Sequence, residues 1–173
     1  VSAHIGNWEA LISAISKEIS VVHPIVKPIG SSGTNNFVYF SRKKNGVEPI
    51  NRKNKGDALR QISKLLEQNK VIGYMMDQAR IGAPRLPFFG DLAETNTSLA
   101  ILWRRYNFSI IPCASRRISF GHHEVELKEP LHLDMTENVK DDIVRHSTYF
   151  NQVVEKMIIQ CPEQYLWMHN RWK

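Results

Sequence analysis

A histidine and a glutamate near the start of the chain, His4 and Glu9, have the residue types of a general base and the carboxylate that orients it. Residues five positions apart on one continuous helix lie about 140° apart around its axis, so their side chains could not converge. A helix must therefore begin between them. Gly6 permits a tight turn and Asn7 is a good N-cap, which places Glu9 in the first helical turn, where the helix dipole favours a carboxylate. The segment thus predicts His4 at a strand end and Glu9 at a helix start, both facing one cleft.

The spacing alone carries little weight, because the chain contains seven histidines and repeats the separation at His132 and Glu137. That second pair has no glycine turn, and Leu131 and Leu133 alternate around an outward-facing His132, as in a solvated strand end. Judged by spacing only, His4 would be interpreted as a structural strand-end histidine. Its glycine turn and asparagine cap are what favour a catalytic interpretation.

The elements that must position these residues alternate between strand and helix. This pattern predicts an α/β fold, a single domain with a central mixed sheet flanked by helices. Two prolines suggest that the first strand lies at a sheet edge. Helices are predicted at residues 8–19, 58–66, 99–106 and 137–159. A further short helix through 37–40 is predicted to follow a turn at 31–36 and to end at Gly46. Strands are predicted at 21–29, 47–50, 71–76, 108–114, 122–128 and 131–133.

A second site candidate, Asp77, directly follows the apolar strand 71–76. Polar residues at the mouth of a buried strand are common site positions in α/β sheets, although a carboxylate that caps the following turn is an equally good interpretation. The next segment contains Gly82, Pro84, Pro87 and Gly90. It predicts a loop long enough to act as a lid or a substrate wall.

Composition indicates an ordinary globular chain of 173 residues with 42% hydrophobic residues, a net charge of +6 and a pI near 9.4. The charge favours an anionic partner: phosphorylated lipid, a membrane surface, an acidic protein or nucleic acid. The two cysteines give neither a disulfide framework nor a metal-ligand spacing, which fits a reducing compartment. No stretch approaches the roughly 20 apolar residues of a membrane span. Because the chain opens without methionine in what resembles a strand end, we expect an N-terminal portion to be missing.

Other catalytic signatures are incomplete. The segment from Gly30 to Thr34 lacks the Gly-Lys-Ser/Thr of a phosphate-binding loop, and no Gly-x-Ser-x-Gly elbow is present. His122-His123-Glu124 is not followed by the Pro-Cys-x-x-Cys of zinc deaminases, so we expect neither a metal nor a cofactor. Cys113 lies in an apolar run, where a thiol is usually an inert small hydrophobe.

Several segments, in order, resemble one family. His4-Ile5-Gly6-Asn7-Trp8-Glu9 is similar to the His-x4-Asp/Glu block of the bacterial lipid A biosynthesis acyltransferases, the lauroyl- and myristoyl-transferring enzymes, and of related phosphatidylinositol mannoside acyltransferases. The later similarities are the basic stretch Arg42 to Gly46, the strand that ends in Asp77-Gln78, the segment Pro87-Phe88-Phe89-Gly90 with Ala93 and Thr95, and the closing Pro162-Glu163-Gln164-Tyr165-Leu166-Trp167-Met168-His169-Asn170-Arg171-Trp172-Lys173.

The resemblance implies a glycerolipid acyltransferase-like domain over residues 1–173 that lacks the family's N-terminal portion and membrane anchor. It implies acyl transfer from a thioester of acyl carrier protein or coenzyme A to a hydroxyl of a lipid A precursor. His4 would be the general base and Glu9 its partner, on an anionic membrane surface at the cytoplasmic face of the bacterial inner membrane, with no nucleic acid partner. The substrate-binding residues would be Asn7, Arg42, Asp77, Arg80, Phe89, Gly90 and Thr95.

Two departures from the family pattern concern substrate contacts: Ser98 replaces a glycine, and Ala79-Arg80-Ile81 replaces a more glycine-rich turn. Arg42, Lys43, Arg80 and Arg85 would contact phosphate or a carrier protein, or would be solvated surface charges. Three alternatives remain at this point. They are a basic nucleic-acid or anionic-surface binding module without catalysis, an acyltransferase for another glycolipid acceptor, and an inactive relative.

Overall fold

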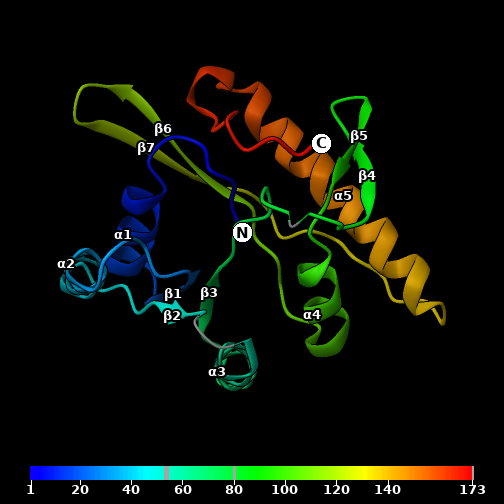
Figure 1. The fold of residues 1–173 in the computed structure, drawn as a ribbon, viewed down its shortest axis with the longest axis horizontal. Helices are drawn as coiled ribbons and strands as arrows, with labels where there is room; N and C mark the ends of the chain where they lie inside the picture. The colour runs from blue at the N-terminus through cyan, green and yellow to red at the C-terminus, as the bar shows by residue number, and fades with distance from the viewer. Residues whose placement is uncertain (53–54, 80, 173) are drawn as a thin grey trace. The chain divides into compact units, whose positions relative to one another are not determined.

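The computed structural model describes residues 1–52, 55–79 and 81–172 (Figure 1). The chain divides into two compact units: Glu9–Tyr74, and Val1–Trp8 together with Met75–Lys173. The predicted α/β class is confirmed, with five α-helices and seven strands in the described ranges. The strands form one parallel sheet of three strands and two antiparallel hairpins.

The unit Glu9–Tyr74 is built on the parallel sheet β2-β1-β3, formed by β1 (Val22–Val26), β2 (Ile50–Asn51) and β3 (Val71–Gly73). Its helices are α1 (Trp8–Glu18), α2 (Ser32–Lys44) and α3 (Lys55–Glu67), and Figure 1 shows α1 and α3 on opposite sides of the strands. The helices predicted at 8–19 and 58–66 are thus confirmed. Apolar side chains at helical and strand spacing form the core: Leu11, Ile12, Val22, Val47, Ile50, Ala58 and Ile62 are buried.

The edge position predicted for the first strand is wrong, because β1 lies between β2 and β3. Val22, His23 and Pro24 pair with β3, and pairing with β2 begins at Ile25. Pro24 thus lies at the junction between the pairing of β1 with β3 and the pairing of β1 with β2. A proline without an N–H is tolerated there, which the sequence pattern alone does not reveal.

Helix α2 begins earlier than predicted, at Ser32, within the expected turn at 31–36. The Ser31 hydroxyl caps it by accepting a hydrogen bond from the Thr34 N–H. Its aromatic side chains Phe37 and Phe40 are 75% and 65% exposed, whereas Arg42 is buried. Helix α2 therefore presents apolar rings to solvent and a charged residue to the interior.

The other unit contains two hairpins and two longer helices. β4 (Arg85–Phe88) pairs with β5 (Asp91–Glu94), and β6 (Cys113–Ser119) pairs with β7 (His122–Leu127). Helix α4 (Ser98–Tyr106) and the hairpin strand β4 both contact the long helix α5 (Val139–Ile159), which is followed by a short 3-10 helix, η1 (Pro162–Gln164) (Figure 1). The core residues include Phe88, Leu99, Trp103, Phe150, Val154, Met157 and Ile158.

The loop predicted to hold Gly82, Pro84, Pro87 and Gly90 is wrong from residue 85 onward, where the β4–β5 hairpin begins, whereas Gly82 and Pro84 do precede β4 in a loop. Leu86 and Phe88 alternate inward along β4, and Phe89 and Gly90 make the tight turn with φ of 53° and 80°. The strand predicted at 108–114 is also shifted. Because Pro112 has no N–H to donate, the ladder with β7 begins only at Cys113. Residues 131–133 form no strand, and β3 ends at Gly73 rather than at residue 76.

Candidate active site

His4 lies on a short extended segment that is hydrogen-bonded on both sides. Ser2 forms a parallel bridge with Met75, and Ile5 forms an antiparallel bridge with Tyr165. The His4 N–H donates to Asp77 Oδ2 at 2.8 Å, and the His4 carbonyl accepts from the Leu166 N–H at 3.0 Å. The backbone of His4 is therefore fixed by two segments that are distant in sequence.

The imidazole of His4 is oriented by Asp77. Its Nδ1 lies 2.9 Å from Oδ1 and 3.1 Å from Oδ2 of that carboxylate, whose side chain is 2% exposed. Because a carboxylate only accepts, Nδ1–H is the donor, and the neutral ring then carries its lone pair on Nε2. The His4 side chain is 20% exposed, and the Gln78 amide nitrogen lies 3.4 Å from Nε2. This tautomer is the one that a general base requires.

The contact that the sequence analysis assigned to Glu9 is thus made by Asp77. Glu9 instead accepts hydrogen bonds from Arg42, whose Nε lies 3.1 and 3.2 Å from the two carboxylate oxygens and whose Nη2 lies 2.5 Å from Oε1. Glu9 does occupy the first turn of α1, as expected. Arg42, in the last turn of α2, is 7% exposed, so Glu9 neutralises a largely buried cation. A catalytic role for Glu9 and substrate binding by Arg42 stay predictions.

Register explains why Asp77 reaches His4. Ser2 pairs in parallel with Met75, so His4 and Asp77 each lie two residues beyond the bridge. Residues two apart on extended chains project from the same face, and the ends of parallel neighbours meet at one edge. The sequence predicted a strand end at each of these residues, but it held no sign that the two segments were neighbours.

Gly6 is required by the turn that follows His4. Its φ is +59°, and a Cβ at this position would lie 2.0 Å from the carbonyl oxygen of Ser115 in β6. The Gly6 N–H donates to the Gln164 carbonyl at 2.9 Å. Asn7 then directly precedes the first residue of α1, as predicted for a cap. The predicted tight turn is confirmed, with close packing as an additional reason for glycine.

The remaining predicted residues lie in different settings. Phe89 and Gly90 form the β4–β5 turn, and the Phe89 ring packs against Phe88 and Trp167 at centroid distances of 4.8 and 5.8 Å. Thr95 is 2% exposed, and its hydroxyl donates to the Ala93 carbonyl and accepts from the Asn151 amide. Thr95 therefore has a structural role, as a buried hydroxyl that joins β5 to α5 by hydrogen bonds. Arg80 lies outside the described residues.

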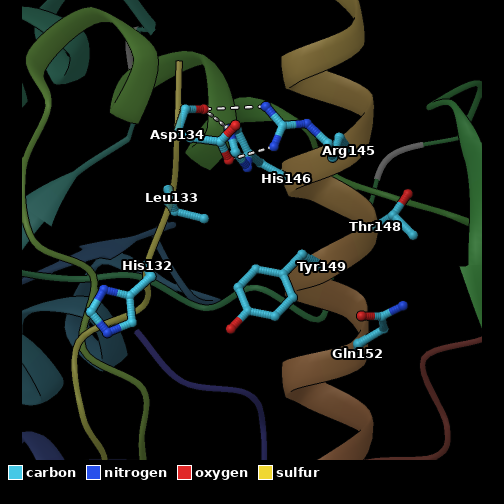
Figure 2. A pocket seen from close by; sticks show the side chains of 8 residues that line it. All are labelled: His132, Leu133, Asp134, Arg145, His146, Thr148, Tyr149 and Gln152. Carbon is cyan, nitrogen blue, oxygen red and sulfur yellow. Dashed lines mark hydrogen bonds and ion pairs between the residues drawn. The ribbon is translucent and has the colours of Figure 1, made fainter. Parts of the chain in front are cut away.

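An open cavity of about 450 Å³ lies along α5, and its lining includes neither His4 nor Asp77 (Figure 2). His132 and Leu133 approach it from the extended segment before α5, and Tyr149 projects into it from the helix. Arg145 donates a hydrogen bond to the Asp134 carboxylate, and His146 Nε2 is hydrogen-bonded to the Asp134 carbonyl oxygen. His132 thus belongs to a different part of this unit and is a suitable control for His4.

The described ranges contain no group of three or more His, Cys, Asp and Glu side chains able to hold a metal ion. Within the same residues, no helix is both long and apolar enough to cross a bilayer.

Tyr165, Gln164 and Arg171 were not predicted as site residues. The Gln164 side chain accepts from the Arg117 N–H at 2.8 Å and donates to the Arg117 carbonyl at 3.1 Å, which joins the closing segment to β6. Only the resemblance of the closing segment pointed to this region. No spacing rule connects Tyr165 with Ile5, or Leu166 with His4.

Sequence comparison with known proteins identifies a family and several relatives of this chain. The sequence profile of the bacterial lipid A biosynthesis acyltransferase family matches residues 1–173. The lipid A biosynthesis lauroyltransferase of Escherichia coli (strain K12) is 30% identical over 126 residues, which cover 66% of this chain and 38% of that protein. A palmitoleoyltransferase of the same strain is 26% identical over 119 residues, covering 66% and 37%.

A lipid A biosynthesis acyltransferase of Haemophilus influenzae (strain ATCC 51907 / DSM 11121 / KW20 / Rd) is 31% identical over 120 residues, covering 66% of this chain and 37% of that relative. The matches thus span less than two fifths of the length of these relatives. The profile match, in contrast, extends over all 173 residues. This chain belongs to the bacterial lipid A biosynthesis acyltransferase family.

Proposed function

We propose that this chain catalyses transfer of a fatty acyl group from a thioester, carried by acyl carrier protein or coenzyme A, to a hydroxyl of a lipid A precursor. The observation that carries the proposal is the His4–Asp77 pair: a buried carboxylate holds Nδ1, and the partly exposed ring has Nε2 as its basic atom. Membership of the family supports the acceptor class.

The His4–Asp77 pair is the only proton carrier that the proposed reaction needs. His4 Nε2 takes the proton of the acceptor hydroxyl as its oxygen attacks the thioester carbonyl, and a C–O bond forms. The tetrahedral intermediate collapses when the C–S bond breaks, and the imidazolium returns its proton to the thiolate that leaves. A positioned base contributes about 10²- to 10⁴-fold, and the Asp77 carboxylate stabilises the imidazolium that forms in between.

We also propose that the enzyme works on an anionic membrane surface, at the cytoplasmic face of the bacterial inner membrane. Phe37 and Phe40 are exposed on α2, and Lys43 and Lys44 lie in the last turn of that helix. Aromatic rings beside lysines suit an interface where apolar surface meets lipid phosphate. Loss of sedimentation with anionic vesicles in a Phe37→Ser/Phe40→Ser variant would support this location, and unchanged sedimentation would contradict it.

The test of catalysis measures transfer of labelled acyl groups from acyl carrier protein to a lipid A precursor by the full-length enzyme. His4→Ala and Asp77→Asn should each lower kcat by about 10²- to 10⁴-fold, equivalent to about 3–5 kcal/mol of transition-state stabilisation. Circular dichroism should show that both variants remain folded. Near-normal turnover by His4→Ala would refute the proposed base.

Two matched variants separate the candidate roles. His132→Ala removes the same kind of side chain from the α5 cavity and should leave kcat nearly unchanged. Glu9→Gln breaks the ion pair with Arg42 while leaving the His4–Asp77 contact in place. If Glu9→Gln abolished turnover and Asp77→Asn did not, the orienting role would belong to Glu9, as the sequence first indicated.

A further inference from the structure

The side-chain amide of Gln78 lies at the atom of His4 that is proposed to act as the base. Its nitrogen is 3.4 Å from His4 Nε2. Because the Nδ1–H of the ring is directed at Asp77, Nε2 carries a lone pair and accepts hydrogen bonds. The NH2 group of Gln78 is therefore the donor in this contact. The resting base thus has a neutral hydrogen-bond donor beside its reactive lone pair.

The backbone fixes where Gln78 lies. The Met76 N–H donates to the Ser2 carbonyl at 2.8 Å, and Asp77 Oδ2 accepts from the His4 N–H at 2.8 Å. Gln78 is the next residue along the chain, so its backbone is held beside the base by the same pairing that brings Asp77 to it. Its side chain, in contrast, is exposed. The side chain is therefore free to change rotamer while its point of attachment stays in place.

The contact between Gln78 and Nε2 has little value for stability. At 3.4 Å it is longer than the roughly 2.7–3.2 Å of ordinary hydrogen bonds from N–H groups, and water would replace it if it were lost. Catalytic hydrogen bonds, however, are often long before substrate binds and shorten in the reacting complex. The length and exposure of the contact therefore fit a group that acts on bound substrate better than one that supports the fold.

The side chains around the imidazole differ in what they offer to a reaction. Asp77 only accepts hydrogen bonds, and its two oxygens lie beside the His4 N–H and Nδ1. The Trp8 ring packs edge-on, with its centroid 6.3 Å from that of the imidazole. Gln78 places an N–H donor at Nε2, which is the side of the ring where substrate must bind.

The proposed reaction needs such a donor close to Nε2. The lipid hydroxyl must lie about 3 Å from Nε2 to give up its proton while its oxygen attacks the thioester carbonyl carbon. Negative charge then develops on the carbonyl oxygen, one bond beyond the attacked carbon. A hydrogen-bond donor for this oxygen must therefore come from a group that lies close to both the base and the attacking oxygen.

We propose that Gln78 is a catalytic residue for acyl transfer: its amide NH2 rests on His4 Nε2 and donates to the oxyanion of the tetrahedral intermediate once the lipid hydroxyl has taken its place. This inference rests on the proposed function. Gln78 transfers no proton, which still passes from the hydroxyl to Nε2 and on to the thiolate as the C–O bond forms and the C–S bond breaks. The hydrogen bond lowers the barrier because it is stronger to the oxyanion than to the neutral carbonyl.

The experiment compares Gln78→Met and Gln78→Glu in the full-length enzyme. Methionine has a similar length but no N–H group, and ionised glutamate keeps the shape of glutamine but cannot donate. Gln78→Met should lower kcat by about 10²- to 10³-fold with little change in KM, as removal of one oxyanion donor does. Gln78→Glu should lose at least as much, because its charge repels the oxyanion. The control Gln152→Met makes the same change at an exposed glutamine of the α5 cavity and should leave kcat unchanged.

Two inhibitors distinguish a contact with the oxyanion from a general role in binding. A phosphonate analogue of the tetrahedral intermediate carries a charged oxygen where the oxyanion forms, whereas a thioether analogue of the thioester has no carbonyl oxygen. Gln78→Met should raise Kd for the phosphonate at least about tenfold and leave Kd for the thioether unchanged. An unchanged Kd for the phosphonate, an equal rise for both inhibitors, or near-normal kcat in either Gln78 variant would overturn the inference.

The His4→Ala variant separates this inference from the proposed function. In a His4→Ala background, Gln78→Met should still weaken phosphonate binding, because the amide acts on the oxyanion and not through the imidazole. An unchanged Kd in that background would overturn the role of Gln78. An active His4→Ala enzyme would refute the proposed function and this inference with it, whereas an inactive one together with near-normal kcat in Gln78→Met would refute the role of Gln78 only.

Discussion

Substitution of Gly6 by alanine should destabilise the protein more than the same change at a left-handed glycine where a Cβ would meet open space. The added Cβ at Gly6 would lie 2.0 Å from the Ser115 oxygen, a backbone atom that has no alternative rotamer. A left-handed conformation costs alanine about 1–2 kcal/mol, and overpacking a well-packed site costs about 1–3 kcal/mol more. The expected loss is therefore about 2–5 kcal/mol.

Gly121→Ala provides the matched control. Its φ is +72°, close to the +59° of Gly6, but a Cβ at Gly121 would meet nothing within 4 Å. Both variants lose the same flexibility in the unfolded chain, so the difference between them isolates the collision with Ser115. Gly121→Ala should cost only the backbone contribution of about 1–2 kcal/mol.

Differential scanning calorimetry of the three proteins measures the effect. For a chain of this size, about 1 kcal/mol corresponds to about 2–4 °C in Tm, so Gly6→Ala should melt about 4–20 °C below the wild type. Equal Tm values for Gly6→Ala and Gly121→Ala would refute the reasoning. Because the Gly6 N–H donates to Gln164 beside His4, acyl transfer by Gly6→Ala should also decline at temperatures where the variant remains folded.

Other consequences can be measured separately. Glu9→Gln and Arg42→Met should each lower the free energy of unfolding in urea, and the double variant should lose less than their sum by about 1 kcal/mol, because either change alone already removes the Glu9–Arg42 ion pair. Hydrogen bonds from Thr136 and Arg145, opposed by burial, hold the pKa of Asp142 well below its usual range. The stability that ionised Asp142 gives to the fold is therefore fully present above the unfolded pKa of about 3.9 and is lost as pH falls toward the lower pKa of the folded state. The difference in Tm between wild type and Asp142→Asn should thus shrink from pH 6 to pH 2.5. Burial raises the pKa of the Cys161 thiol, so iodoacetamide at pH 8 should modify Cys161 only after unfolding, as mass spectrometry would show, and rapid modification of the native protein would contradict its buried position.

Local patterns predicted the parts of the fold that depend on neighbouring residues. The apolar stripe of α3, the turn at Gly6 and the helix that begins at Trp8 are all present. Such features are set by periodicity and by φ preferences, which a short window of sequence contains. The hairpin at Phe89–Gly90 was missed because its prolines favoured a loop, although Leu86 and Phe88 alternate as a strand requires.

The candidate site was predicted only in part, for a physical reason. Glu9 was placed correctly in the first turn of a helix, but the pairing of His4 with Asp77 and of Glu9 with Arg42 depends on which segments become neighbours and in what register. Asp77 is 73 residues from His4 in sequence, and Arg42 is 33 residues from Glu9. The contacts that orient the base are thus a property of the assembled fold, which no five-residue spacing contains.

The hydrogen bond from Leu166 to the His4 carbonyl has a consequence for biosynthesis. The ribosome adds Leu166 more than 160 residues after His4, so the nascent chain carries the proposed base long before the residue that binds its backbone exists. Contacts between residues so distant in sequence have a large cost in loop-closure entropy, and they form slowly. An incomplete chain released before residue 164 would therefore expose a histidine without its scaffold, and competence for acyl transfer would be acquired as a late event of folding.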